Sequence, residues 1–325
     1  MNRRTLRLVP LALAGTFTLA ACGGNASGQE PVADPGRLQV VTSTTVYADL
    51  VSRIGGDLVE AIPVINSVSQ DPHSYEASSR DRLALSKAQL VVVNGGGYDA
   101  FMDVLAQDLK LSESTVITAV DTSPIADDGT AAEEGHAEDS AVKDEHAEHG
   151  AASYNEHVWY DLESMRLLTD EISQRLAKLR PEAAATFSAN AALLTIDLKN
   201  LEAKVADLRG STEGKQFAMT EPVPFHLLED LGMTDATPEG LSESIEGGGE
   251  ISPQAFNEMG KLFDAGDIDV LAYNTQAESP QTERIGKLAD VATVAVIDFT
   301  ETLPPNTDYV SWMESNIRAL EVLSR

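Results

Sequence analysis

The chain has 325 residues, a formal net charge of −29 at pH 7 and 42% hydrophobic residues. This acidic balance argues against nucleic-acid binding, because phosphate recognition needs a basic surface. The apolar content is sufficient for the cores of two ordinary domains. Cys22 is the only cysteine, which excludes an internal disulfide and a cysteine-based metal site.

The first 22 residues have the pattern of a bacterial export signal. Three arginines in the first seven residues precede an apolar run from 8 to 21, which is shorter than the ~20 residues that span a bilayer. The run ends in LAAC, which resembles a lipobox with Cys22 as the lipidated residue. Residues 23–36 are rich in Gly, Ser, Asn and Pro and predict a flexible tether. We therefore expect a lipoprotein anchored through Cys22 to the outer face of the cell membrane.

Strand and helix patterns alternate after the tether. The predicted strands are 38–42, 59–64, 90–93 and 116–120, and the predicted helices are 47–54, 80–88 and 99–109. Strand 90–93 is wholly apolar, as in a parallel sheet covered on both faces. The alternation predicts an N-terminal α/β lobe over residues 37–160.

An acidic segment from 127 to 150 interrupts this lobe. It contains His136, His146 and His149 but has no apolar period, and we interpret it as a disordered loop. Its histidines could collect metal ions weakly, as an auxiliary site. The segment could equally be a solvated insertion without function.

Residues 161–210 are predicted to be helical, and a second α/β lobe follows from 211 to 325. Pro181 opens a long linking helix from 181 to 209, whose leucines and valines recur every three to four residues. In the second lobe the predicted strands are 217–220, 270–273 and 294–297, and the predicted helices are 225–231, 253–265, 279–289 and 309–323. The expected fold is α/β, with two lobes, each a mostly parallel sheet covered by helices, joined by a rigid helix.

Two short strings carry the chemistry. DPHSYE contains His73 and NEHVWYD contains His157, and each places one imidazole between a turn signal and an aromatic residue. An imidazole held on a rigid turn is a common ligand for a divalent transition metal. The two histidines together predict a metal site formed by folding, with Trp159 packed beside it.

These strings occur together with other features in a recognisable order. They are the lipobox, the turn at 71–73, the Asn-Gly-Gly-Gly strand end at 94–97, the turn at 155–159, the long helix, the acidic strand end at Asp298 and the helix from Trp312 to Arg318. Together they resemble the metal-binding lipoproteins of zinc and manganese ABC importers, the cluster A-I solute-binding proteins. The resemblance implies a carrier that delivers a metal ion to a membrane permease, with the metal site in a cleft between the lobes.

The resemblance also implies four ligands, two from each lobe. The first two correspond to His73 and His157, and the fourth to Asp298 at the end of a late strand. The third position falls on Glu221, with His226 as the alternative. Ligands at the carboxyl ends of strands agree with the general rule for α/β sheets.

The choice of metal remains between two ions. Glu221 favours Mn²⁺ and the histidine-bearing segment favours Zn²⁺, and we predict zinc, with manganese as the alternative. Because both imidazoles must be unprotonated, affinity is expected to fall below pH ~6.5. A metal-dependent hydrolase, with Glu76 as its base, and a surface adhesin are the other hypotheses. The sequence lacks a His-Glu-x-x-His string, and we predict a monomeric carrier that is not an enzyme.

Overall fold

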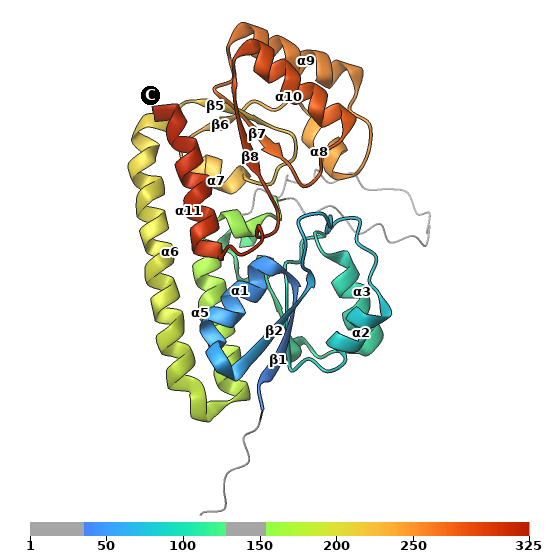
Figure 1. Cartoon of the computed structure of the whole chain (residues 1–325), viewed down its shortest axis with the longest axis vertical. Coiled ribbons are helices and arrows are strands. Elements are labelled where there is room, and N and C mark those ends of the chain that lie inside the picture. Colours follow the sequence, from blue (N-terminus) through green and yellow to red (C-terminus); the bar gives the residue numbers. More distant parts are fainter. Residues whose placement is uncertain (1–35, 128–153, 325) are drawn as a thin grey trace, which may run out of the picture. The chain divides into compact units, whose positions relative to one another are not determined.

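The computed structural model describes residues 36–127 and 154–324. Residues Arg37–Arg325 form one compact unit, whose helices and strands are shown in Figure 1. The predicted signal with Cys22, nearly all of the tether and the three histidines of the acidic segment lie outside the described residues. Among the described helices, none is long and apolar enough to cross a membrane.

The first sheet has four parallel strands in the order β2-β1-β3-β4. Its strands are β1 (Leu38–Thr44), β2 (Val59–Ile65), β3 (Leu90–Val93) and β4 (Val116–Thr118). The helices of this lobe are α1 (Thr45–Gly55), α2 (Ser79–Leu85), α3 (Ala100–Leu109) and the short α4 (Ala119–Thr122).

The apolar run of β3 is buried because helices cover both faces of this sheet. Leu90 and Val92 pack into the core on the side of α1, whereas Val91 and Val93 pack into the core on the side of α3. Alternate residues of a strand point to opposite faces, so a strand that is covered twice must be apolar throughout. The predicted strand 90–93 is thereby confirmed.

Two long helices, α5 (Leu162–Leu179) and α6 (Ala184–Thr212), connect the two sheets. Pro181 lies in the first turn of a 3₁₀ helix, Pro181–Ala183, which leads into α6. The buried stripe of α6 includes Leu194, Leu198, Leu201, Val205 and Leu208. It lets α6 pack along α5 and against α1 and α11 (Tyr309–Leu320), as Figure 1 shows.

The second sheet repeats the first, with four parallel strands in the order β6-β5-β7-β8. Its strands are β5 (Gln216–Met219), β6 (Thr234–Asp235), β7 (Val270–Asn274) and β8 (Ala295–Phe299). Its helices are α7 (Phe225–Asp230), α8 (Leu241–Glu246), α9 (Pro253–Ala265) and α10 (Pro280–Ala292). The predicted architecture of two α/β lobes is confirmed, while β6 and α8 had no counterpart in the sequence analysis.

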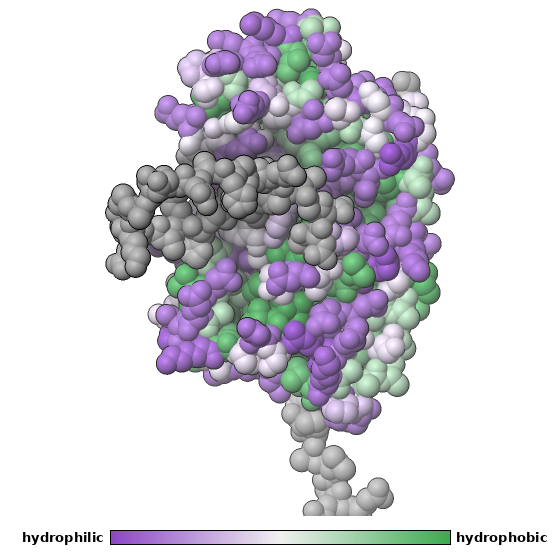
Figure 2. Space-filling model, turned by 180° about the vertical axis from the view of Figure 1, so that it is seen from behind, coloured by the Kyte–Doolittle hydropathy of each residue, from purple (hydrophilic) through white to green (hydrophobic). Residues whose placement is uncertain are grey.

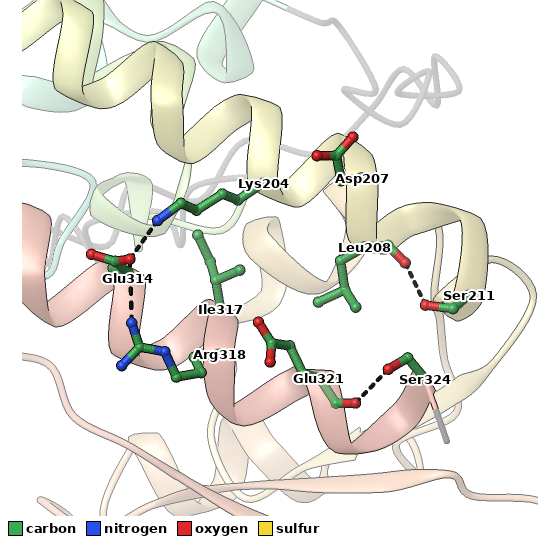
Figure 3. Close-up of a pocket in the computed structure, with 9 residues that line it drawn as sticks. All are labelled: Lys204, Asp207, Leu208, Ser211, Glu314, Ile317, Arg318, Glu321 and Ser324. Atoms are coloured by element: carbon green, nitrogen blue, oxygen red, sulfur yellow. Dashed lines mark hydrogen bonds and ion pairs between the residues drawn. The ribbon is translucent and has the colours of Figure 1, made fainter.

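Hydrophilic residues predominate on the face in Figure 2, between smaller hydrophobic patches. A hollow of 430 Å³ between α6 and α11 is shown in Figure 3. There Glu314 pairs with both Lys204 and Arg318, so the charges offset one another. No residue that lines this hollow is a candidate metal ligand.

Candidate metal centre

His73 lies in a turn that follows β2. Its backbone N–H donates to Oδ1 of Asp71 at 2.9 Å, and the Ser74 hydroxyl donates to the other oxygen of that carboxylate at 2.6 Å. This Asp-centred turn holds the backbone, so that the His73 ring packs edge-on against the ring of Tyr98 at 5.0 Å. The DPHS string thus folds as a turn that presents one imidazole.

His157 is held more tightly, in the turn before the 3₁₀ helix Val158–Tyr160. Oδ1 of Asn155 lies 2.9 Å from the His157 backbone nitrogen and 2.7 Å from its Nδ1. Because an amide oxygen only accepts, Nδ1 carries the proton and Nε2 keeps its lone pair. The side chain is 1% exposed and packs at 5.0 Å against the Trp159 ring, as predicted for that tryptophan. The glycine-rich segment after β3 packs closely against this turn. A Cβ on Gly96 would lie only 2.8 Å from the Glu156 Cβ, so a larger residue at position 96 would push the turn away.

Two buried carboxyl groups form a pair in the second lobe. Glu221 follows β5 and Glu301 follows β8, and Nδ2 of Asn274, the last residue of β7, donates to both. Glu221 is 5% exposed and Glu301 is 2% exposed. β5 and β7 are neighbours in this sheet, with β6 added on the outer side of β5 and β8 on the outer side of β7. Ligands of α/β sheets bind at such a point, where the direction of strand addition changes.

A third carboxyl group contacts the histidines directly. Oε1 of Glu246, the last residue of α8, lies 3.5 Å from Nε2 of His73 and 3.5 Å from Nε2 of His157. These three atoms lie within 4.8 Å of one another. All three are buried and have no hydrogen-bond partner among the described residues. Buried polar atoms normally have a hydrogen-bond partner. This cluster therefore has the ligand atoms and the geometry to hold a cation.

Two amide side chains join the turns of the first lobe to the loops of the second. Nδ2 of Asn155 donates to the Pro222 carbonyl at 2.7 Å, which ties the His157 turn to the Glu221 loop. Nε2 of Gln276 donates to the Gln70 carbonyl at 2.9 Å, three residues before His73. The oxygen of the Gln276 side chain accepts from the backbone N–H of Glu301 at 3.2 Å. Each histidine turn is therefore linked to one carboxylate loop.

Burial sets the protonation of the site. Desolvation, together with the charge of nearby carboxylates, raises the pKa of Glu221 and of Glu246 to about 8. It raises the pKa of Glu301 to about 7, against the hydrogen bond from Asn274. Desolvation also lowers the pKa of His73, and lowers that of His157 well below its usual value. The imidazoles are thus neutral at pH 7, and a divalent cation would stabilise the ionised carboxylates.

The structure does not bring every predicted residue to this site. Asp298 is exposed on β8, next to Val296, because the alternate residues Ile297 and Phe299 are the ones that point into the core. It lines a surface hollow with Lys287 instead. The acidic residue that turns inward is Glu301, three positions later, so we replace Asp298 by Glu301 in the candidate set.

His226, the alternative third ligand, already has a partner. It lies on α7 and is 8% exposed, and its Nε2 is 2.9 Å from the Asn155 carbonyl oxygen. That nitrogen therefore carries the proton and donates. The geometry makes His226 a support for the Asn155 turn, whereas Glu221 is placed beside Glu301.

Sequence reasoning missed Glu301, Asn274 and Glu246. The first two carried a usable signal, because Asn274 ends an apolar strand and Glu301 follows another within a short loop. Glu246 carried none, since a six-residue helix is too short for an apolar period to be recognised.

Fold and site together are those of a metal-binding protein of two α/β lobes. The chain belongs to the ZnuA family, zinc-uptake complex component A, periplasmic, whose match covers residues 40–322. This confirms the family resemblance that the sequence motifs indicated.

Individual relatives differ in the metal that they are named for. The metal ABC transporter substrate-binding lipoprotein FimA of Streptococcus parasanguinis is 26% identical over 97% of both chains. The manganese-binding lipoprotein MntA of Bacillus subtilis is 28% identical, over 60% of this chain and 56% of its own length. Among solved structures, the periplasmic zinc-binding protein TroA of Treponema pallidum has a TM-score of 0.70 at 20% identity, covering 89% of this chain and 100% of TroA. That likeness shows the same fold.

Proposed function

We propose that this protein binds one divalent transition-metal ion outside the cytoplasm and delivers it to the permease of an ABC importer. The observation that carries the proposal is the pair of buried Nε2 atoms of His73 and His157, which lie within 4.8 Å of each other and have no hydrogen-bond partner among the described residues. Membership of the ZnuA family supports the transport role. In this proposal the protein is a carrier and performs no catalysis.

The proposed ligands are His73, His157, Glu221 and Glu301. The two histidines supply neutral nitrogens, and the two carboxylates offset the charge of the ion. Asn274, which donates to both carboxyl groups, orients them as a pair. Two imidazoles with two carboxylates suit zinc and manganese alike, so these four ligands leave the predicted zinc and its alternative open.

Anchoring, partner and auxiliary site follow from the sequence. Lipidation at Cys22 would hold the protein at the outer face of the membrane, where it would meet the permease as a monomer. His136, His146 and His149 would form a weak collecting site if the acidic segment has a function. Cys22 and these three histidines lie outside the described residues.

Metal titration tests the proposed function directly. Full-length protein in mild detergent, stripped with a chelator, is titrated with zinc and with manganese against a competing chelator. We expect one tight site that is weakened more than about 100-fold by His157→Ala, because a ligand is lost. His146→Ala, which removes an imidazole from the acidic segment, is the matched control and leaves the tight site unchanged. Absence of a tight site for either ion, or a tight site in His157→Ala, would contradict the proposal.

A further inference from the structure

The four proposed ligands do not account for Glu246. Its carboxyl group enters the site from α8 and contacts both histidines, although the family's ligand pattern as read from the sequence has no place for it. Leu241 and Ile245 of the same helix are buried in the core of the second lobe, which fixes the helix and directs its last residue toward the histidines. We propose that Glu246 is a fifth metal ligand and that it shifts the selectivity of the site toward manganese. This inference rests on the proposed metal-binding function.

The spacing of the atoms fits a shared ion. Bonds of about 2.1 Å at the angles of about 90–120° in a five-coordinate site separate two neighbouring ligand atoms by about 3.0–3.6 Å. Oε1 of Glu246 is 3.5 Å from each histidine Nε2. One ion placed between the three atoms would therefore need little movement of their side chains.

The surroundings of Glu246 are those of a cation ligand rather than of an ion pair within the protein. The charged groups that act on it are all carboxylates, those of Glu156, Glu221, Glu301 and Glu243. Its Oε1 is buried without a hydrogen bond among the described residues. A buried oxygen that faces two free imidazole nitrogens and is surrounded by acidic groups is stabilised most directly by a bound cation.

A fifth donor changes which ion the site prefers. Zinc is typically four-coordinate in structural sites and is bound mainly by nitrogen and sulfur ligands, whereas manganese suits carboxylates and octahedral sites. A site of two imidazoles and three carboxylates reduces the difference by which its affinity for zinc usually exceeds its affinity for manganese. Glu246 therefore affects the choice between zinc and manganese. His73 and His157 do not, because they bind both ions.

The test compares Glu246→Gln with Glu250→Gln in the full-length protein. Glu250 is exposed four residues further on, so this control removes the same charge without touching the site. We expect Glu246→Gln to weaken manganese binding by about tenfold or more and zinc binding by less, so that the ratio of zinc to manganese affinity rises. Equal losses for both ions, or affinities that match those of Glu250→Gln, overturn the proposal.

Two further measurements separate ligation from charge and from folding. In the Co²⁺-loaded protein, loss of a fifth ligand strengthens the visible d–d absorption, and an unchanged spectrum in Glu246→Gln overturns ligation. Glu246→Asp keeps the charge but withdraws the oxygen by one methylene, so under this proposal it also loses manganese affinity. Wild-type affinity in Glu246→Asp would contradict direct ligation.

Failure of this inference is distinguishable from failure of the proposed function. If wild-type protein binds manganese and zinc tightly and His157→Ala does not, the carrier proposal stands whatever Glu246→Gln does. If wild-type protein binds neither ion, the proposed function fails first.

Discussion

Asn155 is the residue whose replacement tests the organisation of the site most directly. Its side-chain oxygen accepts from the His157 backbone at 2.9 Å and from the His157 ring at 2.7 Å, and its nitrogen donates to Pro222 at 2.7 Å. Asn155 is not one of the proposed ligands. It orients His157 and ties this histidine to the loop that carries Glu221.

Asn155→Ala removes all three hydrogen bonds. At about 1 kcal/mol each, their loss lowers the free energy of unfolding by roughly 3 kcal/mol. The His157 ring loses the acceptor that fixes its tautomer and orientation, and loss of such a partner weakens metal binding by about 10- to 100-fold. Asn155→Asp keeps the acceptor for Nδ1 but cannot donate to Pro222, so it is expected to lose stability while retaining most of the metal affinity.

The assays are urea unfolding of the metal-free protein and competitive titration of zinc and manganese. Asn190→Ala is the matched control, because Asn190 makes a single 3.0 Å bond to the Ile54 carbonyl and takes no part in the site. It should lose about 1 kcal/mol of stability and no metal affinity. If Asn155→Ala is destabilised but binds both ions like the wild type, then His157 does not depend on Asn155 for its orientation, and the reasoning is refuted.

Three further predictions concern the carboxylates and His226. Glu301→Gln should weaken metal binding by more than tenfold in the competitive titration, whereas Asp298→Asn should leave it unchanged; the reverse result would restore Asp298 as the ligand. His226→Gln can still donate to the Asn155 carbonyl, so it should retain affinity within about threefold, while Glu221→Gln should lose more than tenfold. The raised pKa values of Glu221 and Glu246, about 8 for each, mean that the folded metal-free protein holds protons that the unfolded chain has released above pH ~4.5. Its free energy of unfolding should therefore fall by roughly 2 kcal/mol per group between pH 5.5 and 7. Metal affinity should rise about tenfold per pH unit for each proton that the metal ion displaces. Stability and affinity that do not change with pH, in urea unfolding and in metal titration, would contradict the raised pKa values.

That last expectation moves the pH dependence away from the histidines. The sequence alone predicted that affinity would fall below pH ~6.5 as the imidazoles became protonated. Burial lowers the pKa of both histidines and raises that of Glu221. The carboxyl groups therefore titrate first, and the decline begins nearer pH 8. Burial could not be read from the order of residues around these positions.

The fold was predictable because its signals are local. The apolar run at 90–93, the proline at 181 and the period of leucines after it each report on structure within a few residues, and the structure agrees at those positions. The two histidine turns were predictable for the same reason, since Asp71 and Asn155 act on residues two positions away.

The carboxylates were harder to predict because their placement depends on tertiary packing. An acidic residue near a strand end points inward or outward according to a period of two, and an error of one position changes the side of the sheet. Asp298 fell on the exposed side, and Glu301 reaches the interior only after the chain has left β8. Glu246 depends on how α8 packs in the second core, which no local pattern reports.

The hydrogen bonds between the lobes bear on how the ion would leave. Asn155 holds the His157 turn to the loop at Pro222, and Gln276 holds the segment before His73 to the loop of Glu301. Separating the lobes widely would break these bonds at about 1 kcal/mol each, in addition to the bonds to the ion. We therefore expect release to proceed through small shifts of the lobes rather than through a wide opening between them.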